Sequence, residues 1–139
     1  MTVVVDASVA LKWFVAEDDS AAALDLLGSS EVLIAPDLVV AEVSNAAWKA
    51  VRSGLMKPEQ QDRAASRLGF AFDELVPLAL LAPRAVVISR LLAHAVYDCF
   101  YLALAEARSA TLVTADRRLL LRIAGTQWEG LAQHIRHAH

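Results

Sequence analysis

The sequence predicts an α/β fold with a central, mostly parallel sheet of four to five strands and helices on both faces. Short apolar, β-branched runs alternate with longer segments of helical periodicity, which is the pattern of parallel strands joined by crossover helices. The 139 residues suit one domain with a sizeable core, and no repeat, linker or low-complexity run divides them. We therefore expect a single domain over residues 1–139.

The first half of the chain is expected to hold two strands and three helices. Three β-branched residues, Val3 to Val5, indicate a short buried strand at about 2–6. Ser8 suits the N-cap of a helix over about 8–16, because its hydroxyl can accept from a free backbone N–H. The remaining elements are each bounded by a cap or breaker: a helix over 21–27 between Ser20 and Gly28, a strand over 32–35 closed by Pro36, and a helix to about 53 between Asp37 and Gly54.

The second half is expected to open with a helix over about 58–71, because Pro58 suits a first helical turn. Residues 75–78 form a weaker candidate strand, whose proline favours an edge position or a strand end. The later elements follow the same alternation: two helical segments from Pro83 or Arg84 to about 108 with a break near 94–96, a strand over 111–114, a short helix over 117–124 ended by Gly125, and a weak candidate strand over 128–132.

Composition narrows the functional classes. The net charge of -3 argues against a generally basic nucleic-acid binder, although bound cations could offset carboxylates at one site. The single cysteine, Cys99, cannot form an internal disulfide and fits a reducing compartment as a small core residue. No basic region precedes the first apolar run, and the longest apolar stretch, 75–82, is far below the ~20 residues of a membrane span. We expect a soluble, cytoplasmic protein.

Four carboxylates stand out because their sequence neighbours are apolar. Asp6 directly follows three valines, and Asp116 follows a predicted strand. Glu42 lies in an apolar helix opening, and Asp98 is the only formally charged residue within 91–105. Because the carboxyl ends of strands are where open α/β sheets bind ligands, we predict that Asp6 is the first member of an acidic cluster.

An ionised carboxylate in apolar surroundings is costly unless a partner offsets its charge, and no nearby Arg or Lys is placed to pair with Asp98. Mg²⁺ or Mn²⁺ would resolve the conflict, because these ions prefer oxygen ligands; no His/Cys spacing suggests zinc. Taken singly, each acid also has a structural interpretation: a turn or cap at a strand end for Asp6 and Asp116, a solvated helix face for Glu42, and a bond to His94 one helical turn earlier for Asp98.

Four segments carry a family resemblance in their order and spacing. They are Val3–Val9 with the first acid, Pro36–Asn45 with the glutamate, Tyr97–Ala105 with the third acid and Leu112–Leu119 with the fourth. The chain resembles PIN-domain ribonucleases and, among them, the VapC-type toxins of bacterial toxin–antitoxin systems. The resemblance covers nearly the whole length, and none of the four acids is replaced. It implies a PIN-like α/β/α sandwich.

The resemblance also implies Mg²⁺- or Mn²⁺-dependent hydrolysis of RNA phosphodiesters, leaving a 5′-phosphate and a 3′-hydroxyl. One or two ions would be held by Asp6, Glu42, Asp98 and Asp116, with Asp6 and Asp98 as the main ligands. The other two acids would bind a second ion or orient water, one of them serving as base.

Hydroxyl, amide and basic side chains near the acids are the candidates for support. Ser8 and Thr114 could orient a water or a phosphate oxygen, or serve as a cap and a turn contact. Asn45 shares the helix face of Glu42 and could support it or bond another helix. Cations that could bind RNA are Lys12, Lys49, Arg52, Arg117 and Arg118, of which Arg117 adjoins the fourth acid. Trp13 and Trp48 could stack on bases, although core or interface packing is commoner.

The same resemblance implies partners. The family usually forms homodimers, at times within larger assemblies, and is inhibited by a small antitoxin, which we expect to contact the helices around 20–71. A PIN nuclease that processes RNA without a toxin role is the nearest alternative. A receiver-like phospho-acceptor module also gathers acids at strand ends, but it needs a late lysine and the last lysine here is Lys57. A haloacid-dehalogenase-like phosphatase would need a second aspartate in place of Ser8.

Overall fold

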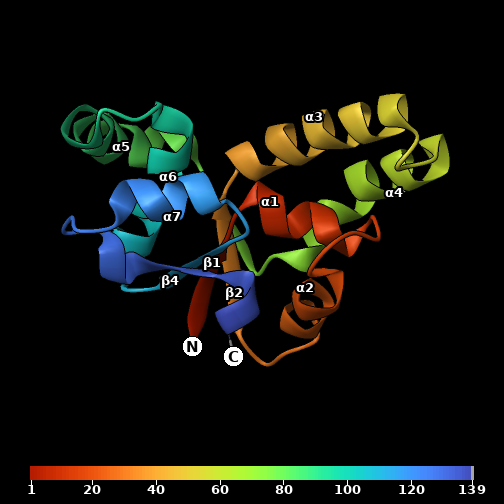
Figure 1. The fold of residues 1–139 in the computed structure, drawn as a ribbon, viewed down its shortest axis with the longest axis horizontal. Helices are drawn as coiled ribbons and strands as arrows, with labels where there is room; N and C mark the ends of the chain where they lie inside the picture. Colours follow the sequence, from red (N-terminus) through yellow and green to blue (C-terminus); the bar gives the residue numbers. More distant parts are fainter. Residues whose placement is uncertain (139) are drawn as a thin grey trace.

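A computed structural model describes residues 1–138 and contains one five-stranded sheet in which every neighbouring pair is parallel (Figure 1). The strand order is β3-β2-β1-β4-β5. The strands are β1 (Thr2–Val5), β2 (Val32–Pro36), β3 (Glu74–Val76), β4 (Thr111–Thr114) and β5 (Ala132–His134). The predicted fold class is confirmed, and β3 occupies the edge that its following proline favours.

Seven α-helices and four short 3-10 turns connect the strands within residues 1–138. Figure 1 shows α5 and α6 on one side of β1 and β2, and α1 and α2 on the other. The helices are α1 (Ala7–Ala10), α2 (Ser20–Leu27), α3 (Leu38–Ser53), α4 (Pro58–Arg67), α5 (Leu78–Leu92), α6 (Val96–Arg108) and α7 (Arg117–Ile123).

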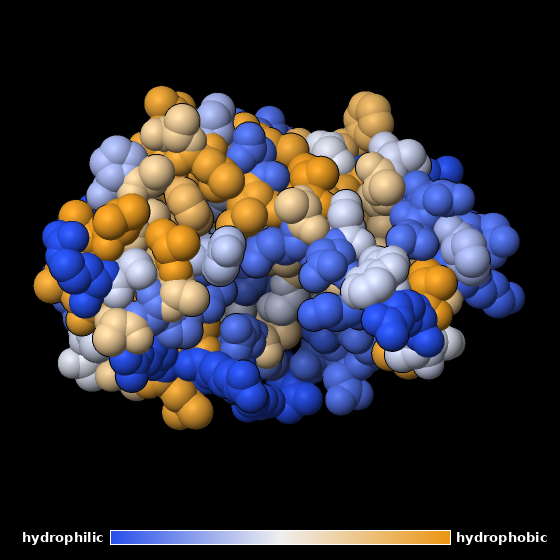
Figure 2. Space-filling view, turned by 90° about the horizontal axis from the view of Figure 1, so that it is seen from above, coloured by the Kyte–Doolittle hydropathy of each residue, from blue (hydrophilic) through white to orange (hydrophobic). Residues whose placement is uncertain are grey.

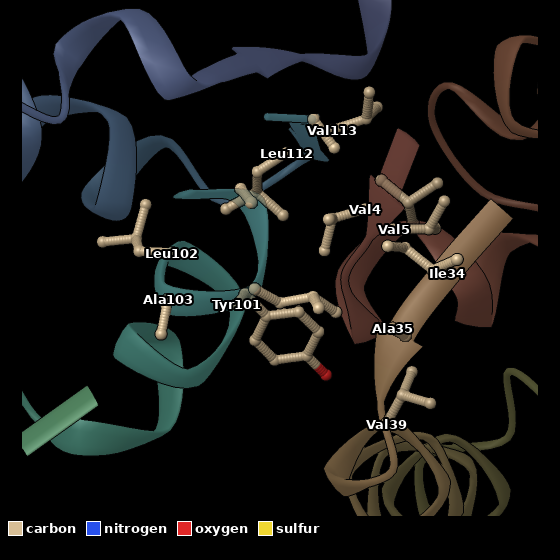
Figure 3. Packing of buried hydrophobic residues seen from close by; sticks show 14 of the residues in the cluster. Val4, Val5, Ile34, Ala35, Val39, Tyr101, Leu102, Ala103, Leu112 and Val113 are labelled. Atoms are coloured by element: carbon tan, nitrogen blue, oxygen red, sulfur yellow. The ribbon is translucent and has the colours of Figure 1, made fainter. Parts of the chain in front are cut away.

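The core lies where α6 packs on the central strands. Residues 101–105 of α6 are all buried, so this helix contacts protein around most of its circumference. Figure 3 shows its side chains against those of β1, β2 and β4, in particular Val4, Ile34 and Leu112. Strands buried on both faces explain the near-continuous apolar runs in the sequence. Cys99 is also fully buried, as expected of a core residue.

Three helix starts differ from the sequence-based prediction. Asp6, and not Ser8, caps α1, because the Asp6 carboxylate accepts from the Val9 N–H and the backbone bends directly after β1. Ser20 is the first residue of α2, and Asp19 precedes it with φ 65°. α5 begins at Leu78, five residues before Pro83, so the helix accommodates a proline early in its length at the loss of one backbone hydrogen bond.

Other boundaries shift for tertiary reasons. The helix expected over 8–16 ends as a 3-10 turn at Leu11–Trp13, and the one expected over 58–71 changes to a 3-10 turn at Leu68–Ala71. The weak last strand lies at Ala132–His134 and not at 128–132, because only those residues pair with β4. Residue 139 lies outside the described residues.

Within residues 1–138, no single helix is long and apolar enough to cross a membrane. α5 and α6 reach the required length and hydropathy only when counted together, and they meet at a bend of 117°.

Candidate active site

All four acids identified in the sequence line one cavity of about 120 Å³ at the carboxyl edge of the sheet. Asp6 follows β1 directly, and Asp116 follows the neighbouring strand β4 two residues after its end. Parallel strands end at the same edge, so these two side chains approach although they are far apart in sequence. Glu42 comes from the second turn of α3, and Asp98 from the first turn of α6. Ala7, Ser8 and Tyr101 complete the lining.

Asp6 is the most buried of the four, with 6% of its surface exposed. Its Oδ1 accepts from the Ser8 hydroxyl at 2.5 Å and the Val9 N–H at 3.2 Å, and its Oδ2 accepts from the Thr114 hydroxyl. Burial raises the pKa of Asp6 to about 6, with the Asp98 charge adding to the rise and the hydrogen bonds from Ser8 and Thr114 opposing it. The structure thus fixes a buried carboxylate that forms no ion pair with any residue from 1 to 138.

Ser8 and Thr114 join Asp6 to the loop that carries Asp116. The Thr114 hydroxyl accepts from the Asp116 N–H at 2.9 Å, and the Ser8 hydroxyl accepts from the Ala115 N–H at 2.9 Å. The Asp116 carboxylate in turn accepts from two N–H groups in the first turn of α7, which is the cap interpretation considered above. Both hydroxyls therefore orient Asp6 while also accepting from backbone N–H groups of the loop after β4.

Tyr101 is a site residue that the sequence reasoning missed. It is 1% exposed, and its hydroxyl donates to Glu42 Oε1 at 2.6 Å. Figure 3 shows this hydroxyl pointing toward α3. Burial raises the pKa of Glu42, and so does the Asp98 charge, while the bond from Tyr101 opposes the rise. The signal in the sequence was the spacing, because Tyr101 follows Asp98 by three residues and so shares its helix face.

The structure is compatible with both interpretations of Asp98, as a partner of His94 and as a ligand in the acidic cavity. His94 Nε2 lies 2.7 Å from Asp98 Oδ2, the contact one helical turn earlier that the structural interpretation expected. The other carboxylate oxygen has no hydrogen-bond partner within residues 1–138, and the side chain still lines the cavity. His94 can therefore orient the Asp98 carboxylate through Oδ2 and leave Oδ1 available to a ligand in the cavity.

Two other sequence candidates lie at or near the cavity without contacting its acids. Asn45 is exposed on α3 and lines an adjoining hollow together with Glu42 and Lys49. Arg117 is exposed at the start of α7, and neither residue makes a side-chain hydrogen bond or an ion pair within the described part of the chain. Their functional roles stay predictions.

Two of the candidate RNA-binding residues are structural. Lys12 is buried and bonds Glu17 Oε1 at 3.2 Å and the Asp18 carbonyl at 2.7 Å, so it is not available to RNA. The Trp13 indole N–H donates to the Ala23 carbonyl, and its ring packs 5.5 Å from that of Phe72. Trp48, in contrast, is 46% exposed.

The donor chemistry of the cavity fits a hard divalent cation. All four acids offer oxygen ligands, and the Asp6 carboxyl, whose pKa is raised by burial, forms no ion pair within residues 1–138. Glu42, Asp98 and Asp116 each have one oxygen that no described group occupies. Within residues 1–138, no three His, Cys, Asp or Glu side chains already stand close enough to bind one ion, so the acids would have to converge on it.

The chain is similar to known proteins over most of its length. Residues 3–125 match the family model described as PIN domain. Ribonuclease VapC3 of Pyrobaculum aerophilum is 32% identical over 121 residues, covering 86% of this chain and 92% of the relative. Ribonuclease VapC1 of Mycobacterium tuberculosis is 35% identical over 118 residues, covering 84% and 86% respectively.

Solved structures share the fold. A Pyrobaculum aerophilum protein, PAE2754, superposes with a TM-score of 0.64 at 22% identity, covering 98% of this chain and 85% of its own. A toxin–antitoxin complex from Klebsiella pneumoniae matches with a TM-score of 0.64 at 15% identity, covering 96% and 97%. The strand order also differs from the 2-1-3-4-5 order of receiver domains, which excludes that alternative. The chain belongs to the PIN-domain family and groups within it with the VapC proteins.

Proposed function

We propose that this protein is a Mg²⁺- or Mn²⁺-dependent endoribonuclease and the toxin of a toxin–antitoxin pair. The main support is one observation: carboxylates from four separate elements line the same cavity, and the buried Asp6, whose pKa is raised, forms no ion pair among the described residues. The curated relatives at 32% and 35% identity are named ribonucleases, which favours RNA over other phosphodiesters.

In this proposal, Asp6 and Asp98 are the main metal ligands, and Glu42 and Asp116 bind a second ion or orient water. When bound, the metal lowers the pKa of a coordinated water and offsets charge on the phosphate. The chain's own groups hold the ligands in place: Ser8 and Thr114 for Asp6, Tyr101 for Glu42, His94 for Asp98 and the first N–H groups of α7 for Asp116.

Hydrolysis would join the water oxygen to phosphorus and break the bond from phosphorus to the 3′ oxygen. The leaving oxygen takes up a proton, giving a 3′-hydroxyl and a 5′-phosphate. Asn45 and Arg117 are two exposed polar groups that would contact the substrate, because Asn45 lines the adjoining hollow and Arg117 adjoins Asp116 in sequence.

The partner part of the proposal is a small inhibitory antitoxin and a second copy of the chain. One solved structure of this fold is a toxin–antitoxin complex from Klebsiella pneumoniae, and another is VapBC2 from Rickettsia felis bound to a DNA fragment from its promoter. α5 exposes Leu80, Val86 and Leu91, and Figure 2 shows apolar side chains gathered over that side of the molecule. Contiguous exposed apolar surface is typical of an interface. A single domain over residues 1–139, acting in the cytoplasm where its RNA lies, completes the proposal.

The test is incubation of the purified protein with a 5′-labelled, randomised pool of 12-nucleotide RNA, with Mn²⁺ or with EDTA. We expect Mn²⁺-dependent products with 3′-hydroxyl ends. Asp98→Asn should abolish them, and Asp62→Asn, an exposed acid on α4, is the matched control that should not. Cleavage by Asp98→Asn at the wild-type rate would refute the site.

The toxin role needs a separate measurement in cells. Induction of the wild-type chain should arrest growth, and induction of Asp98→Asn should not. Co-expression of a small protein encoded beside the gene should relieve the arrest. Cleavage without growth arrest would favour an RNA-processing nuclease.

A further inference from the structure

The acidic cavity opens into a polar track along α3. Three hollows follow one another and share lining residues: the acid cavity, a hollow of about 270 Å³ between α1 and α3, and one of about 280 Å³ at the end of α3. Ala7, Ser8 and Glu42 line both of the first two, and Lys49 lines both of the last two. A continuous path therefore leads away from the acids.

The helical register of α3 explains the track. Glu42, Asn45, Lys49 and Arg52 are spaced by three, four and three residues, so they form one stripe on the helix. With a rise of about 1.5 Å per residue, Lys49 and Arg52 lie roughly 10 and 15 Å along the helix from Glu42. A single-stranded nucleic acid that leaves the cavity along α3 would meet the Asn45 amide first and then the cations Lys49 and Arg52.

The charges on this stripe are complementary to a phosphate backbone. After Glu42, α3 carries no further acid, and neither Lys49 nor Arg52 makes an ion pair within residues 1–138. By contrast, Arg84, Arg108 and Arg136 are each paired with a carboxylate. In a chain of net charge -3, two unpaired cations beside an acidic site supply the attraction that the acids alone would deny to an anionic substrate.

An aromatic platform adjoins the cations. The Arg52 guanidinium lies 4.9 Å from the ring centroid of Trp48, which is 46% exposed. Exposed aromatic rings beside cations are how proteins hold single-stranded nucleic acid, the ring stacking on a base and the cation contacting phosphate. In Figure 2, hydrophilic side chains cover the α3–α4 side of this face, whereas apolar ones cover the α5 side.

We infer that Lys49, Arg52 and Trp48 bind single-stranded RNA a few nucleotides from the cleaved bond. Lys49 and Arg52 contact phosphates, and Trp48 stacks on a base. The inference rests on the proposed ribonuclease activity and adds to it the path of the substrate. It also predicts that longer RNA is cut more efficiently than RNA too short to reach the end of α3.

The experiment measures kcat/KM in Mn²⁺ for randomised 12-nucleotide and 4-nucleotide RNA pools over a range of KCl concentrations. Lys49→Ala/Arg52→Ala should lower kcat/KM for the 12-nucleotide pool about tenfold, through KM, and leave the 4-nucleotide pool nearly unchanged. The slope of log kcat/KM against log salt should become shallower by about 1.4, because each lost phosphate contact on a single strand removes about 0.7.

Trp48 is tested by two substitutions. Trp48→Ala should lower kcat/KM for the 12-nucleotide pool about fivefold or more, because it removes one stacked base. Trp48→Phe keeps an aromatic face and should restore most of the loss. A merely structural role for Trp48 would instead lower the cleavage of both pools equally.

The matched control is Arg63→Ala/Arg67→Ala, which removes two exposed cations on α4 that line a different groove. An equal loss in this control would overturn the inference, because any two cations would then suffice. Wild-type kinetics in Lys49→Ala/Arg52→Ala would also overturn it, and would leave the ribonuclease proposal intact. If these variants cut RNA normally but resist inhibition by the antitoxin, the surface belongs to the protein partner. No cleavage by the wild-type chain would refute the proposed function itself, and the inference with it.

Discussion

The acids near the two ends of α6 have opposite surroundings: a buried cavity at the amino end and an arginine partner at the carboxyl end. At the amino end, Asp98 lies in the cavity with Asp6 and Glu42, and burial raises the pKa values of Asp6 and Glu42. At the carboxyl end, Glu106 accepts two bonds from Arg84, and these lower the pKa of Glu106.

Arg108, the last residue of α6, makes a similar forked pair with Glu74 of β3, and its bonds lower the pKa of Glu74. Within residues 1–138, arginines therefore pair with acids at this end of the helix, whereas no arginine or lysine forms an ion pair with a cavity acid. Because the described acids at the amino end lack the arginine partners found at the carboxyl end, we infer that the cavity acids are kept for an external cation.

Removing the acid at the amino end should have the largest effect. Asp98→Asn should lower RNA cleavage by about a thousandfold or more, because metal-ion catalysis contributes several kcal/mol. Stability should stay near that of wild type, since the change also removes a like charge from the cavity. Glu106→Gln is the control at the other end and should keep full activity. Loss of cleavage in both variants would mean that the acids at the two ends of α6 do not differ in their importance for catalysis.

The second largest effect should be on the pH dependence of stability, which should differ between the cavity acids and the arginine-paired acids. Burial raises the pKa of Asp6 from 3.8 to about 6, so between about pH 4 and pH 6 the folded state binds a proton that the unfolded state has released. Without metal, the free energy of unfolding should fall as the pH rises through this window, by on the order of 3 kcal/mol. Urea denaturation in EDTA at several pH values measures this fall.

Asp6→Asn should remove most of that pH dependence, and Mn²⁺ should restore the stability of the wild type above pH 6. The paired acids act with the opposite sign: their pKa values are lowered, so their smaller contribution disappears as the pH falls below their unfolded pKa. A wild-type stability that rises between pH 4 and pH 6 in EDTA would contradict the assignment of Asp6.

Tyr101→Phe should have an intermediate effect. The hydroxyl that orients Glu42 is lost, and groups that orient metal ligands are commonly worth about 10–100-fold in metal affinity or activity. Activity titrated with Mn²⁺ should show the loss, with only about 1 kcal/mol of stability removed. Tyr97→Phe, on the exposed side of the same helix, is the matched control. Equal Mn²⁺ titrations for the two variants would show that the hydroxyl of Tyr101 does not act on the site.

The smallest effect is expected from breaking the ion pair at the carboxyl end of α6. Arg108→Ala breaks the fork to Glu74, but both side chains are more than 40% exposed, so the change in stability should be close to zero. RNA cleavage should be unchanged. A loss of several kcal/mol, measured by thermal or urea unfolding, would mean that this pair anchors α6 and would weaken the contrast between its ends.

Some misplaced features in the sequence-based picture depend on partners far along the chain. Ser8 looked like a helix cap, but its hydroxyl accepts from Ala115, 107 positions away. Lys12, which looked like an RNA-binding cation, is a local exception, because Glu17 and the Asp18 carbonyl, five and six positions later, bind its buried side chain. Tyr101 went unnoticed, because its partner Glu42 lies 59 positions earlier.

The sequence alone determined the fold class, three of the five strands and the four acids that line the cavity. These depend on local physics: β-branched runs favour strands, Gly and Pro end elements, and a carboxylate among apolar residues is conspicuous. Only the tertiary structure decided which acid is most buried, which hydroxyls hold it, where β5 pairs and which cations stay unpaired. Those properties come from contacts between distant segments, and their strength depends on burial that no local stretch of sequence specifies.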